Sequence, residues 1–587
     1  MEKWFVAAKR ADFHKWAEEF GISPILARII RNRDITEEEQ VRKFLNGTLA
    51  DCYSPWLLYD MDRAVKLLLE AVDRGTFIRV IGDYDVDGIC SSYILTRGLG
   101  LLGAKVDTAI PHRIHDGYGL NDHLIQEAYE EGVGMIVTCD NGIAAAPQIE
   151  LAAKLGIQVI ITDHHEVPFV MKDGERQELL PPALAVVNPK QEKDCYPFPN
   201  ICGGVVAYKL MAALQERAAG SALEGALEEF LAFAAFATVC DVMELRDENR
   251  IIVKEGLKRL RTIENQGLLA LIEVNGLEKD KLSAYHLGFV LGPCLNATGR
   301  LDTAKRALEL LQSTTRTEAM TAAAELKALN DSRKNLTLQG VELAEQLILA
   351  EHRERDKVLV IYLPQVHESL AGIIAGRIRE KYNRPVFLLT RGEEDVKGSG
   401  RSVPAYHMFE AMTEVKQYFT RFGGHRLAAG LSMKEEDIPA LCRALNDNCR
   451  LTEEDFIPQV HIDVPMPLYA GDQGLALELE KLEPFGVGNP RPLFAQKGLI
   501  FKAGYRMGKN KTAARFSVLT PEGENRQLVF FGDLERFGAF LREKYGEDSE
   551  GALYSGRGHF DISVVYQLGL NTYKGCREVQ YIMQYYC

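Results

Sequence analysis

The chain has 587 residues, of which 46% are hydrophobic and 26% are charged, and its formal net charge is −14. This composition is typical of a globular protein, and the length leaves room for three or four domains. The first twenty residues lack the pattern of a signal peptide. The longest apolar run, 230–240, is too short to span a membrane. Eleven cysteines without a C-x-x-C pair argue against a zinc site or a disulfide framework and favour the cytoplasm.

Residue patterns along the chain predict an α/β fold followed by a β-rich tail. From 77 to 165, strands such as "FIRVIG", "GMIVTCD" and "IQVIITD" alternate with helical stretches, which indicates a parallel sheet with helices on both faces. We place an N-terminal helical segment at 1–70, the parallel-sheet domain at 71–305, connecting helices including a long one at 306–355, a smaller α/β domain at 356–455, and a small β-barrel at 456–587. "TEEE" (36–39) is expected to form a capping box.

The string "DYDVDG" (83–88) has the opening of an EF-hand calcium loop. An EF-hand would place a glutamate at the twelfth position, which is Ile94 here, and a helix before the loop, where "TFIRVIG" has the pattern of a strand. The aspartates are therefore predicted on a turn between the carboxyl end of a strand and a helix, where parallel sheets bind ligands.

Acidic and imidazole side chains recur at such positions. One alone is more typical of a helix cap than of a ligand, but several at one sheet edge are hard to explain as caps. Clustered carboxylates repel one another unless cations neutralise them, and oxygen ligands with one or two imidazoles suit Mn²⁺ or Mg²⁺ better than zinc. Two such ions imply phosphoester hydrolysis. The residues are Asp83, Asp85, Asp87, Asp140, Asp163, His164 and His165, with Asp241 at the end of a later apolar run.

The order DYDVDG, TCDNG, DHH and a later isolated aspartate resembles the DHH phosphoesterase superfamily. "PHRIHDGYGL" (111–120), "GPCLNATGRLDTA" (292–304), "GSGRS" (398–402), "GGHRLAAG" (423–430) and "PFGVGNPRPLF" (484–494) narrow the resemblance to the RecJ family of bacterial single-strand-specific DNA exonucleases. It covers the chain from about residue 50 onward. The resemblance identifies the three predicted domains as a DHH domain, a DHH-associated domain and an OB-fold.

The resemblance also implies roles for the acidic and imidazole residues. Asp140 would bridge two metal ions, and His165 would donate a proton to the leaving 3′-oxygen. In the alternative interpretation, one of the two histidines, His164 or His165, only orients the other. Asp163 would hold a histidine tautomer. The implied metal ligands are Asp85, Asp87, Asp140, His164 and Asp241, with Asp83 close by or coordinating.

Arginines and small polar residues are the predicted phosphate contacts. Arg113 and Arg300 are expected in glycine-containing loops, where a solvated arginine is the alternative to a guanidinium that grips phosphate. The DHH-associated domain offers Ser399, Arg401, Ser402 and His425, expected in glycine-rich turns. The two domains would face each other across a cleft too narrow for a duplex. His367 is expected to precede a helix that Glu368 and Ser369 cap, without a catalytic role.

The tail supplies positive charge that the acidic chain otherwise lacks. "KAGYRMGKNKTAAR" (502–515) holds five basic residues and no acidic one, which suits an OB-fold that binds a single strand by phosphate attraction and base stacking. A solvated basic hairpin is the alternative. Tyr566 and Tyr573 are further candidate stacking platforms. The predicted nucleic-acid contacts in this hairpin are Lys502, Tyr505, Arg506, Lys509, Lys511 and Arg515.

The resemblance implies a processive exonuclease that degrades single-stranded DNA from the 5′ end to mononucleotides in recombination and repair. Single-strand-binding protein and a helicase are the implied partners, although the chain stops soon after the barrel, where some relatives carry a partner-binding domain. Two alternatives stay open. One is a DHH-type phosphodiesterase for short RNA or cyclic dinucleotides, and the other is a Cdc45-like replication scaffold without metals.

Overall fold

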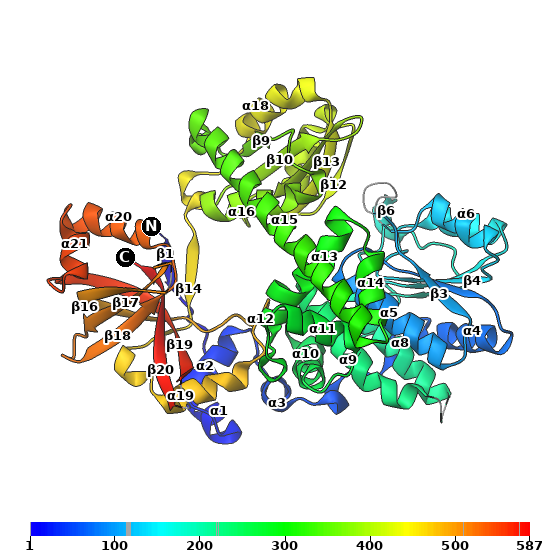
Figure 1. The fold of residues 1–587 in the computed structure, drawn as a ribbon, viewed down its shortest axis with the longest axis horizontal. Coiled ribbons are helices and arrows are strands. Elements are labelled where there is room, and N and C mark those ends of the chain that lie inside the picture. The colour runs from blue at the N-terminus through cyan, green and yellow to red at the C-terminus, as the bar shows by residue number, and fades with distance from the viewer. Residues whose placement is uncertain (1, 113–118, 219, 221, 509, 574–575) are drawn as a thin grey trace. The chain divides into compact units, whose positions relative to one another are not determined.

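The computed structural model describes residues 2–112, 119–218, 220, 222–508, 510–573 and 576–587 (Figure 1). The chain forms two compact units. We call Met1–Cys52, Glu244–Lys254 and Gln459–Cys587 the barrel unit, and Tyr53–Met243 and Glu255–Pro458 the two-sheet unit. No helix among the described residues combines the length and the apolar character needed to cross a membrane.

The larger sheet of the two-sheet unit is entirely parallel, as the sequence predicts, with the strand order β3-β2-β4-β5-β8. All five residues of β4 are buried, since helices cover both faces. A hairpin, β6–β7, lies between β5 and β8 in the chain. The strands are β2 (Ile78–Ile81), β3 (Val106–Ala109), β4 (Met135–Cys139), β5 (Gln158–Thr162), β6 (Phe169–Lys172), β7 (Glu175–Glu178) and β8 (Ala185–Val187).

Helices pack on this sheet through continuous apolar surfaces. Residues of α6 and α7 form one buried cluster with the strands, while α5 and α8 contact the strands elsewhere and pack against each other and α9. The apolar run predicted as a buried helix is the second half of α9, in which Phe230, Phe233 and Phe236 are fully buried. The helices are α4 (Met61–Asp73), α5 (Val86–Leu101), α6 (Asp122–Glu130), α7 (Ala146–Lys154), α8 (Gly203–Arg217) and α9 (Leu223–Cys240).

A run of helices leads from the larger sheet to the smaller one, ending in the predicted long helix, α15 (Figure 1). Its 35 residues correspond to about 50 Å at 1.5 Å per residue. A π-helical turn, η4 (Leu287–Leu291), precedes α13. The helices are α11 (Gln266–Val274), α12 (Ala284–His286), α13 (Gly292–Leu301), α14 (Lys305–Gln312) and α15 (Arg316–Ala350). They follow α10 (Asp247–Leu260), whose residues up to Lys254 belong to the barrel unit.

The smaller sheet is mixed, with the order β12-β13-β11-β10-β9 and one parallel pair, β9–β10. Helices α15 and α16 contribute to one apolar cluster on it, and α17 and α18 contribute to another. Its elements are β9 (Leu359–Tyr362), α16 (Glu368–Tyr382), β10 (Val386–Arg391), β11 (Val396–Arg401), α17 (Met408–Glu414), β12 (Arg421–Gly424), β13 (Ala428–Met433) and α18 (Ile438–Asn448).

The barrel unit contains the predicted β-barrel, in which β16 pairs with β17 and β19 and so closes the sheet β15-β16-β17-β18-β20-β19. Its core is rich in phenylalanine. The elements are β14 (Gln459–Ile462), β15 (Val464–Pro465), α19 (Gln473–Leu479), β16 (Phe494–Met507), β17 (Ala513–Leu519), β18 (Asn525–Phe530), α20 (Leu534–Tyr545), α21 (Ser549–Tyr554), β19 (Phe560–Tyr573) and β20 (Cys576–Tyr586).

The first part of the barrel unit, up to Cys52, contains β1 (Lys3–Val6), which pairs with β14, and is otherwise mainly helical. Its helices are α1 (Phe13–Phe20), α2 (Pro24–Asn32) and α3 (Glu38–Asn46). The capping box lies one residue later than predicted, because Glu37 is the N-cap of α3 and its N–H donates to Gln40 Oε1 at 3.3 Å.

Arg250 of α10 is fully buried inside the barrel unit, where it donates hydrogen bonds to carbonyls of Phe44 and of residues 481–484. Its guanidinium lies 3.9 Å from the centroid of the Phe44 ring. Burial lowers the pKa of Arg250 to about 10. The carbonyls satisfy a buried charge that the sequence does not mark as special.

Candidate metal centre

The turn between β2 and α5 arranges the first three aspartates. Asp85 is the N-cap of α5, and its Oδ1 accepts hydrogen bonds from the N–H groups of Asp87 (2.9 Å) and Gly88 (3.2 Å). A Cβ at Gly88 would lie 2.4 Å from the carbonyl oxygen of Asp83, so only glycine fits there. Asn296 Oδ1 accepts from the N–H of Val86 at 3.1 Å and ties the turn to α13. The EF-hand is excluded because a strand, not a helix, enters this turn.

Two glycines that the sequence analysis missed hold Asp87. The N–H groups of Gly203 and Gly204, at the start of α8, each donate to one carboxylate oxygen of Asp87 at 2.7 Å. A Cβ at Gly203 would lie 2.8 Å from Asp140 Cβ, and one at Gly204 would lie 2.6 Å from Ala237 Cβ. The doublet in "NICGGVV" at a helix start is the signal that marks them.

Asp140 and Asp241 both lie at strained turns. Asp140 follows β4 with φ 61°, and Val242, directly after Asp241, has φ 59°. Such angles cost a non-glycine residue roughly 1–2 kcal/mol, and for a β-branched valine they are rare. Around Asp140, the Asn141 side chain donates to the carbonyls of Ile81 and Cys139 and holds the loop. Asp241 caps the C-terminus of α9, so it reaches the site from a helix end and not from a strand.

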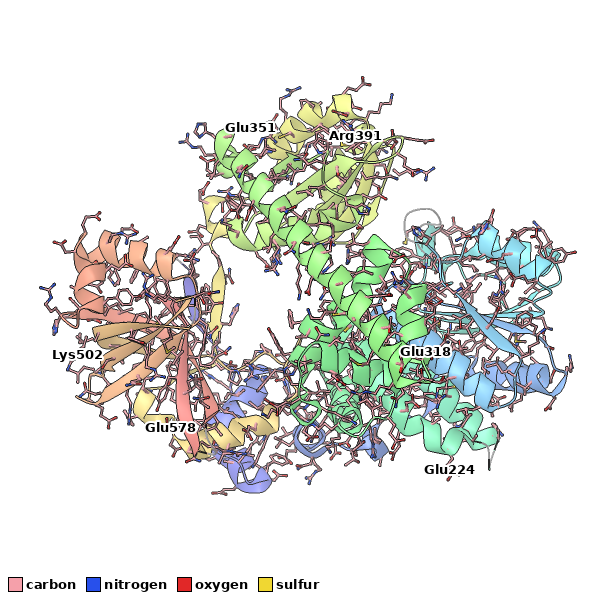
Figure 2. The ribbon with its side chains drawn as sticks, in the orientation of Figure 1. Glu224, Glu318, Glu351, Arg391, Lys502 and Glu578 are labelled. Atoms are coloured by element: carbon pink, nitrogen blue, oxygen red, sulfur yellow. The ribbon has the colours of Figure 1, made fainter. Side chains whose placement is uncertain are left out.

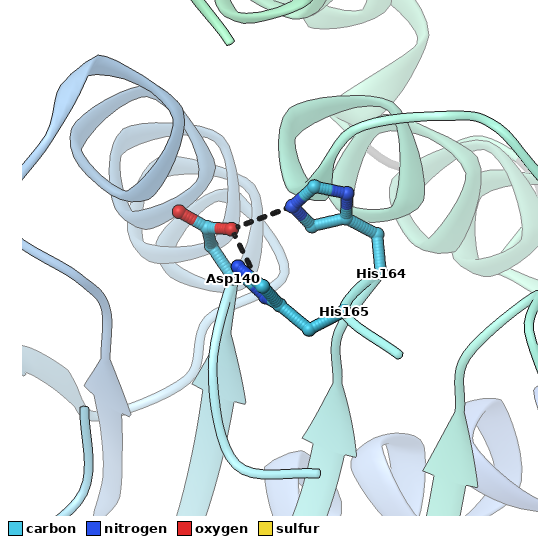
Figure 3. Close-up of side chains that lie close together, drawn as sticks. All are labelled: Asp140, His164 and His165. Carbon is cyan, nitrogen blue, oxygen red and sulfur yellow. Dashed lines mark hydrogen bonds and ion pairs between the residues drawn. The ribbon is translucent and has the colours of Figure 1, made fainter. Parts of the chain in front are cut away.

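The side chains from these separate turns converge (Figure 3). His164 Nε2 lies 3.0 Å from Asp140 Oδ1, 3.5 Å from Asp87 Oδ2 and 3.8 Å from Asp241 Oδ2. Among the described residues, three overlapping groups have potential metal-ligand atoms within 4.8 Å of one another, and Asp140 belongs to two of them. The groups are Asp83–Asp85–Asp140, Asp140–His164–His165 and Asp87–His164–Asp241.

The electrostatics of this cluster favour cations. Burial, followed by repulsion from Asp87, raises the pKa of Asp85 and Asp140, and burial with repulsion from Asp87 and Asp85 raises the pKa of Asp241 to about 8. Divalent ions remove this repulsion. A donor set of carboxylate oxygens with one or two imidazoles fits Mn²⁺ or Mg²⁺.

His165 has a different environment from His164. Its Nδ1 lies 2.8 Å from Asp163 Oδ1, and Asp163 is itself fixed by N–H groups of Ile143 and of His164. Burial opposes the charged ring, but the hydrogen bond to Asp163 and the neighbouring carboxylates raise the pKa of His165 to about 9. Burial lowers the pKa of His164. The His165 side chain is 43% exposed, so it can meet a substrate.

A cavity of about 690 Å³ opens beside the two histidines. Its lining includes Asp163, His164 and His165 from the larger sheet, together with Lys190. His425, from the turn between β12 and β13 of the smaller sheet, also lines it. The sequence placed His425 among the substrate contacts, and the structure brings it to the same cavity as the catalytic candidates.

Three of the other predicted phosphate contacts do not lie in the glycine-containing loops and turns that the sequence analysis predicts. Arg300 lies in the last turn of α13, not in a loop, and donates to the carbonyl of Ser369 at 2.8 Å. Ser399 and Arg401 lie on strand β11, and Arg401 Nη1 donates to Ser399 Oγ at 3.1 Å. Ser402 is buried, and its hydroxyl donates to the carbonyl of Tyr406 at 2.8 Å. Arg113 lies outside the described residues.

His367, for which no catalytic role was predicted, is itself the N-cap of α16, and its Nδ1 accepts from the N–H of Ser369 at 3.3 Å. The expectation that Glu368 and Ser369 form the cap is therefore wrong. An imidazole nitrogen serves here in the way an N-cap oxygen usually does.

The basic hairpin β16–β17 distributes its predicted contacts over two faces. Tyr505, 71% exposed, is the cross-strand partner of the exposed Arg515. Arg506 has the opposite orientation, because it pairs with Glu550 at 3.0 Å and lies over the Tyr554 ring. Of the remaining contacts, Lys502 lies on β16 (Figure 2) and is partly buried, Lys511 is exposed, and Lys509 lies outside the described residues.

The prediction that Tyr566 is a stacking platform is wrong, because its ring is fully buried and its hydroxyl donates to the carbonyl of Met466 at 2.9 Å. The side chain of Tyr573 lies outside the described residues.

Metal removal should destabilise the two-sheet unit more at pH 8 than at pH 6. The raised pKa values mean that the metal-free folded state binds more protons than the unfolded state, so its stability falls as pH rises toward about 8. Bound metal removes that loss. We expect the difference in Tm between Mn²⁺-loaded and EDTA-treated protein to grow by several degrees from pH 6 to pH 8, measured by calorimetry. A difference that shrinks over this range would contradict the carboxylate cluster as the metal site.

Gly203→Ala should weaken metal binding at least tenfold, because the added Cβ would push against Asp140 and the Asp87 carboxylate. Isothermal titration with Mn²⁺ measures this. Gly225→Ala is the matched control, since a Cβ at Gly225 of α9 meets no atom within 4 Å. Equal Mn²⁺ affinity in both variants would show that the α8 N-terminus does not hold the site.

Models of three domain families match the chain: the DHH family N-terminal domain at residues 77–238, the DHHA1 domain at 355–451 and the RecJ OB domain at 462–585. The chain is 33% identical over 579 residues to the single-stranded-DNA-specific exonuclease RecJ of Bacillus subtilis, covering 97% of this chain and 68% of that protein. It is 33% identical to RecJ of Escherichia coli, covering 96% and 95%.

Solved structures agree with these relatives. RecJ from Thermus thermophilus in complex with Mn²⁺ superimposes with a TM-score of 0.80 at 28% identity, covering 100% of this chain and 79% of that one. The Mg²⁺ complex from the same organism gives a TM-score of 0.73 at 26% identity, covering 100% and 78%. With about one third of its residues identical to curated relatives over nearly its whole length, the chain belongs to the RecJ family of single-stranded-DNA-specific exonucleases.

Proposed function

We propose that this protein is a metal-dependent exonuclease that hydrolyses single-stranded DNA from the 5′ end into mononucleotides, in recombination and repair. The observation that carries this proposal is the convergence of Asp140, His164 and Asp241, with their neighbours, beside a cavity of about 690 Å³. RecJ relatives named as single-stranded-DNA-specific exonucleases support it. The direction of cleavage follows from the family resemblance and not from a distance in the site.

The donor groups would hold two cations between them. Asp140 belongs to two ligand groups, which supports its role as the bridge. When bound, two divalent ions would lower the pKa of the attacking water and stabilise charge developing on the phosphate. The full proposed set is Asp83, Asp85, Asp87, Asp140, His164 and Asp241.

His165 is proposed to donate a proton to the leaving 3′-oxygen. Asp163 engages Nδ1, so the proton delivered to the substrate would come from Nε2. The hydrogen bond to Asp163 also fixes the ring plane. This arrangement supports an acid role for His165 and a ligand role for His164.

The smaller sheet is proposed to hold the phosphate of the terminal nucleotide. Ser399 and Arg401 are joined by a hydrogen bond, and His425 lines the catalytic cavity. A guanidinium and an imidazole can contact phosphate oxygens together. Arg113 remains a prediction for the same role. Arg300 and Ser402 make contacts within the protein that position α16 and the strand end, and we propose that they support the phosphate contacts from there.

The barrel is proposed to bind part of the same DNA strand. Stacking on Tyr505 and phosphate attraction to Arg515 would act on one face of the hairpin. Single-strand-binding protein and a helicase are proposed partners, because a single-strand-specific enzyme needs duplex to be opened. The cysteines whose side chains the structure describes are all free thiols, which supports a cytoplasmic location.

The alternatives are less well supported. A scaffold without metals would not need the carboxylate cluster, and a dinucleotide phosphodiesterase would not need the matched RecJ OB domain. The RecJ-like interpretation explains both features.

Asp140→Ala should lower the cleavage rate at least a thousandfold and change DNA affinity less than twofold, because it removes the carboxylate that two candidate ligand groups share but leaves the barrel intact. Strands labelled at the 5′ or the 3′ end, digested with Mn²⁺ or Mg²⁺, give both rate and direction. The control is Asp280→Ala, an exposed aspartate outside the site. Release of label from 3′ ends first, or full activity of the Asp140 variant, would refute the proposal.

Tyr505→Ala and Arg515→Ala should each weaken binding of single-stranded DNA, Tyr505→Ala by about 1–3 kcal/mol through lost stacking. Arg515→Ala should also lower the slope of log affinity against log salt by about 0.7. Fluorescence anisotropy at several salt concentrations measures both effects. Arg506→Ala is the matched control, since Arg506 pairs with Glu550. If Arg506→Ala weakens binding as much as Arg515→Ala, the assigned face is wrong.

A further inference from the structure

A second cavity, of about 410 Å³, lies on the smaller sheet of the two-sheet unit. Strands β11, β12 and β13 and the start of α16 form it. None of its lining residues lines the cavity at the metal centre. The residues that matter for its chemistry are Glu368, Lys397, Arg421 and Ser432.

The strand register places two cations in one row. Lys397 is paired with Ser432, and Ser432 is paired with Arg421. Directly opposed residues on antiparallel strands point to the same face, with Cβ atoms about 5 Å apart. Lys397 and Arg421 are both exposed, and neither has a salt bridge within the part of the chain that the structure describes. Glu368 is the one carboxylate among the residues lining this cavity, so the row has an excess of positive charge.

Two glycines on the strands beneath the cavity leave its space unfilled. Gly423 and Gly430 are cross-strand partners, and a Cβ at either position would meet no atom within 4 Å. Neither glycine has a positive φ. Packing and backbone conformation therefore do not require glycine here, and the missing side chains leave space above the sheet that a ligand can occupy.

The row continues the proposed phosphate contacts along the same strands. Gly430 is paired with Ser399, two residues and about 7 Å along β11 from Lys397. On β12, the chain runs from Arg421 through Gly423 to the turn that carries His425, which lines the catalytic cavity. The Lys397–Arg421 row therefore lies on the far side of Ser399 from His425.

We propose that this cavity is a second phosphate subsite, which receives a phosphate group one step further from the metal centre than the phosphate assigned to Ser399, Arg401 and His425. Lys397 supplies a point charge, Arg421 a planar donor pair and Ser432 a hydroxyl, which together match phosphate oxygens. The inference that this phosphate lies further from the metal centre rests on the proposed function. Such a phosphate would belong either to a 5′-polyphosphate on the strand or to a free polyphosphate anion.

The first test measures binding without catalysis. Inorganic tripolyphosphate is titrated calorimetrically into the full-length protein in EDTA. The Lys397→Met/Arg421→Met variant should bind at least tenfold more weakly than the wild type. Arg391→Met/Lys434→Met is the matched control, since these cations line another cavity on the same sheet, and it should bind within twofold of the wild type. Equal affinity in all three proteins, or equal loss in both variants, would overturn the subsite.

The second test identifies the source of the phosphate. The ratio of kcat/KM on single-stranded DNA with a 5′-triphosphate to that with a 5′-monophosphate should fall at least tenfold in the Lys397→Met/Arg421→Met variant if the strand end is the ligand. An unchanged ratio with reduced tripolyphosphate binding assigns the subsite to a free anion. The wild-type protein could cut neither the 5′-triphosphate nor the 5′-monophosphate strand and still bind tripolyphosphate more tightly than the variant. That result would refute the proposed function but would still support the subsite.

Discussion

Repulsion among buried carboxylates is the constraint on which this structure depends. Asp85, Asp87 and Asp140 lie at one edge of the larger sheet, and burial together with mutual repulsion raises the pKa of Asp85 and Asp140. A fold gains nothing from such an arrangement by itself. The cluster would become favourable when divalent cations are bound, because they would offset the repulsion that weakens the metal-free protein.

Neighbouring elements hold the cluster by backbone groups more than by side chains. The start of α8 donates two N–H groups to Asp87, and the glycines there allow the helix to approach Asp140. Positive φ angles turn the chain sharply at one candidate ligand, Asp140, and at Val242, directly after another candidate, Asp241. Local strain of this kind persists only where the surrounding structure fixes it, as the Asn141 hydrogen bonds do for Asp140.

The smaller sheet and the barrel each present positively charged side chains, but in different settings. On the smaller sheet, basic side chains and serines lie on strands that also contain glycines, which leaves open space beside them. On the barrel, Tyr505 and Arg515 form a cross-strand pair, while Arg506 is neutralised by Glu550. A net charge of −14 is thus compatible with binding a polyanion, because basic side chains are concentrated on particular surfaces of the protein.

The sequence by itself determined the type of sheet and the candidate ligand residues at its strand ends. Alternating strand and helix patterns predicted the parallel sheet, and strand ends predicted that Asp85, Asp140 and His164 would meet, because parallel strands share one carboxyl edge. Tertiary structure alone decided what depends on contacts between distant segments: the N–H groups that hold Asp87, and the approach of Asp241 from a helix. It also decided which side chains of the hairpin face outward. A β-bulge between Phe501 and Ala503 shifts the register there, and since a shift of one residue reverses the two faces of a strand, no local pattern can assign Tyr505 and Arg506 to their sides.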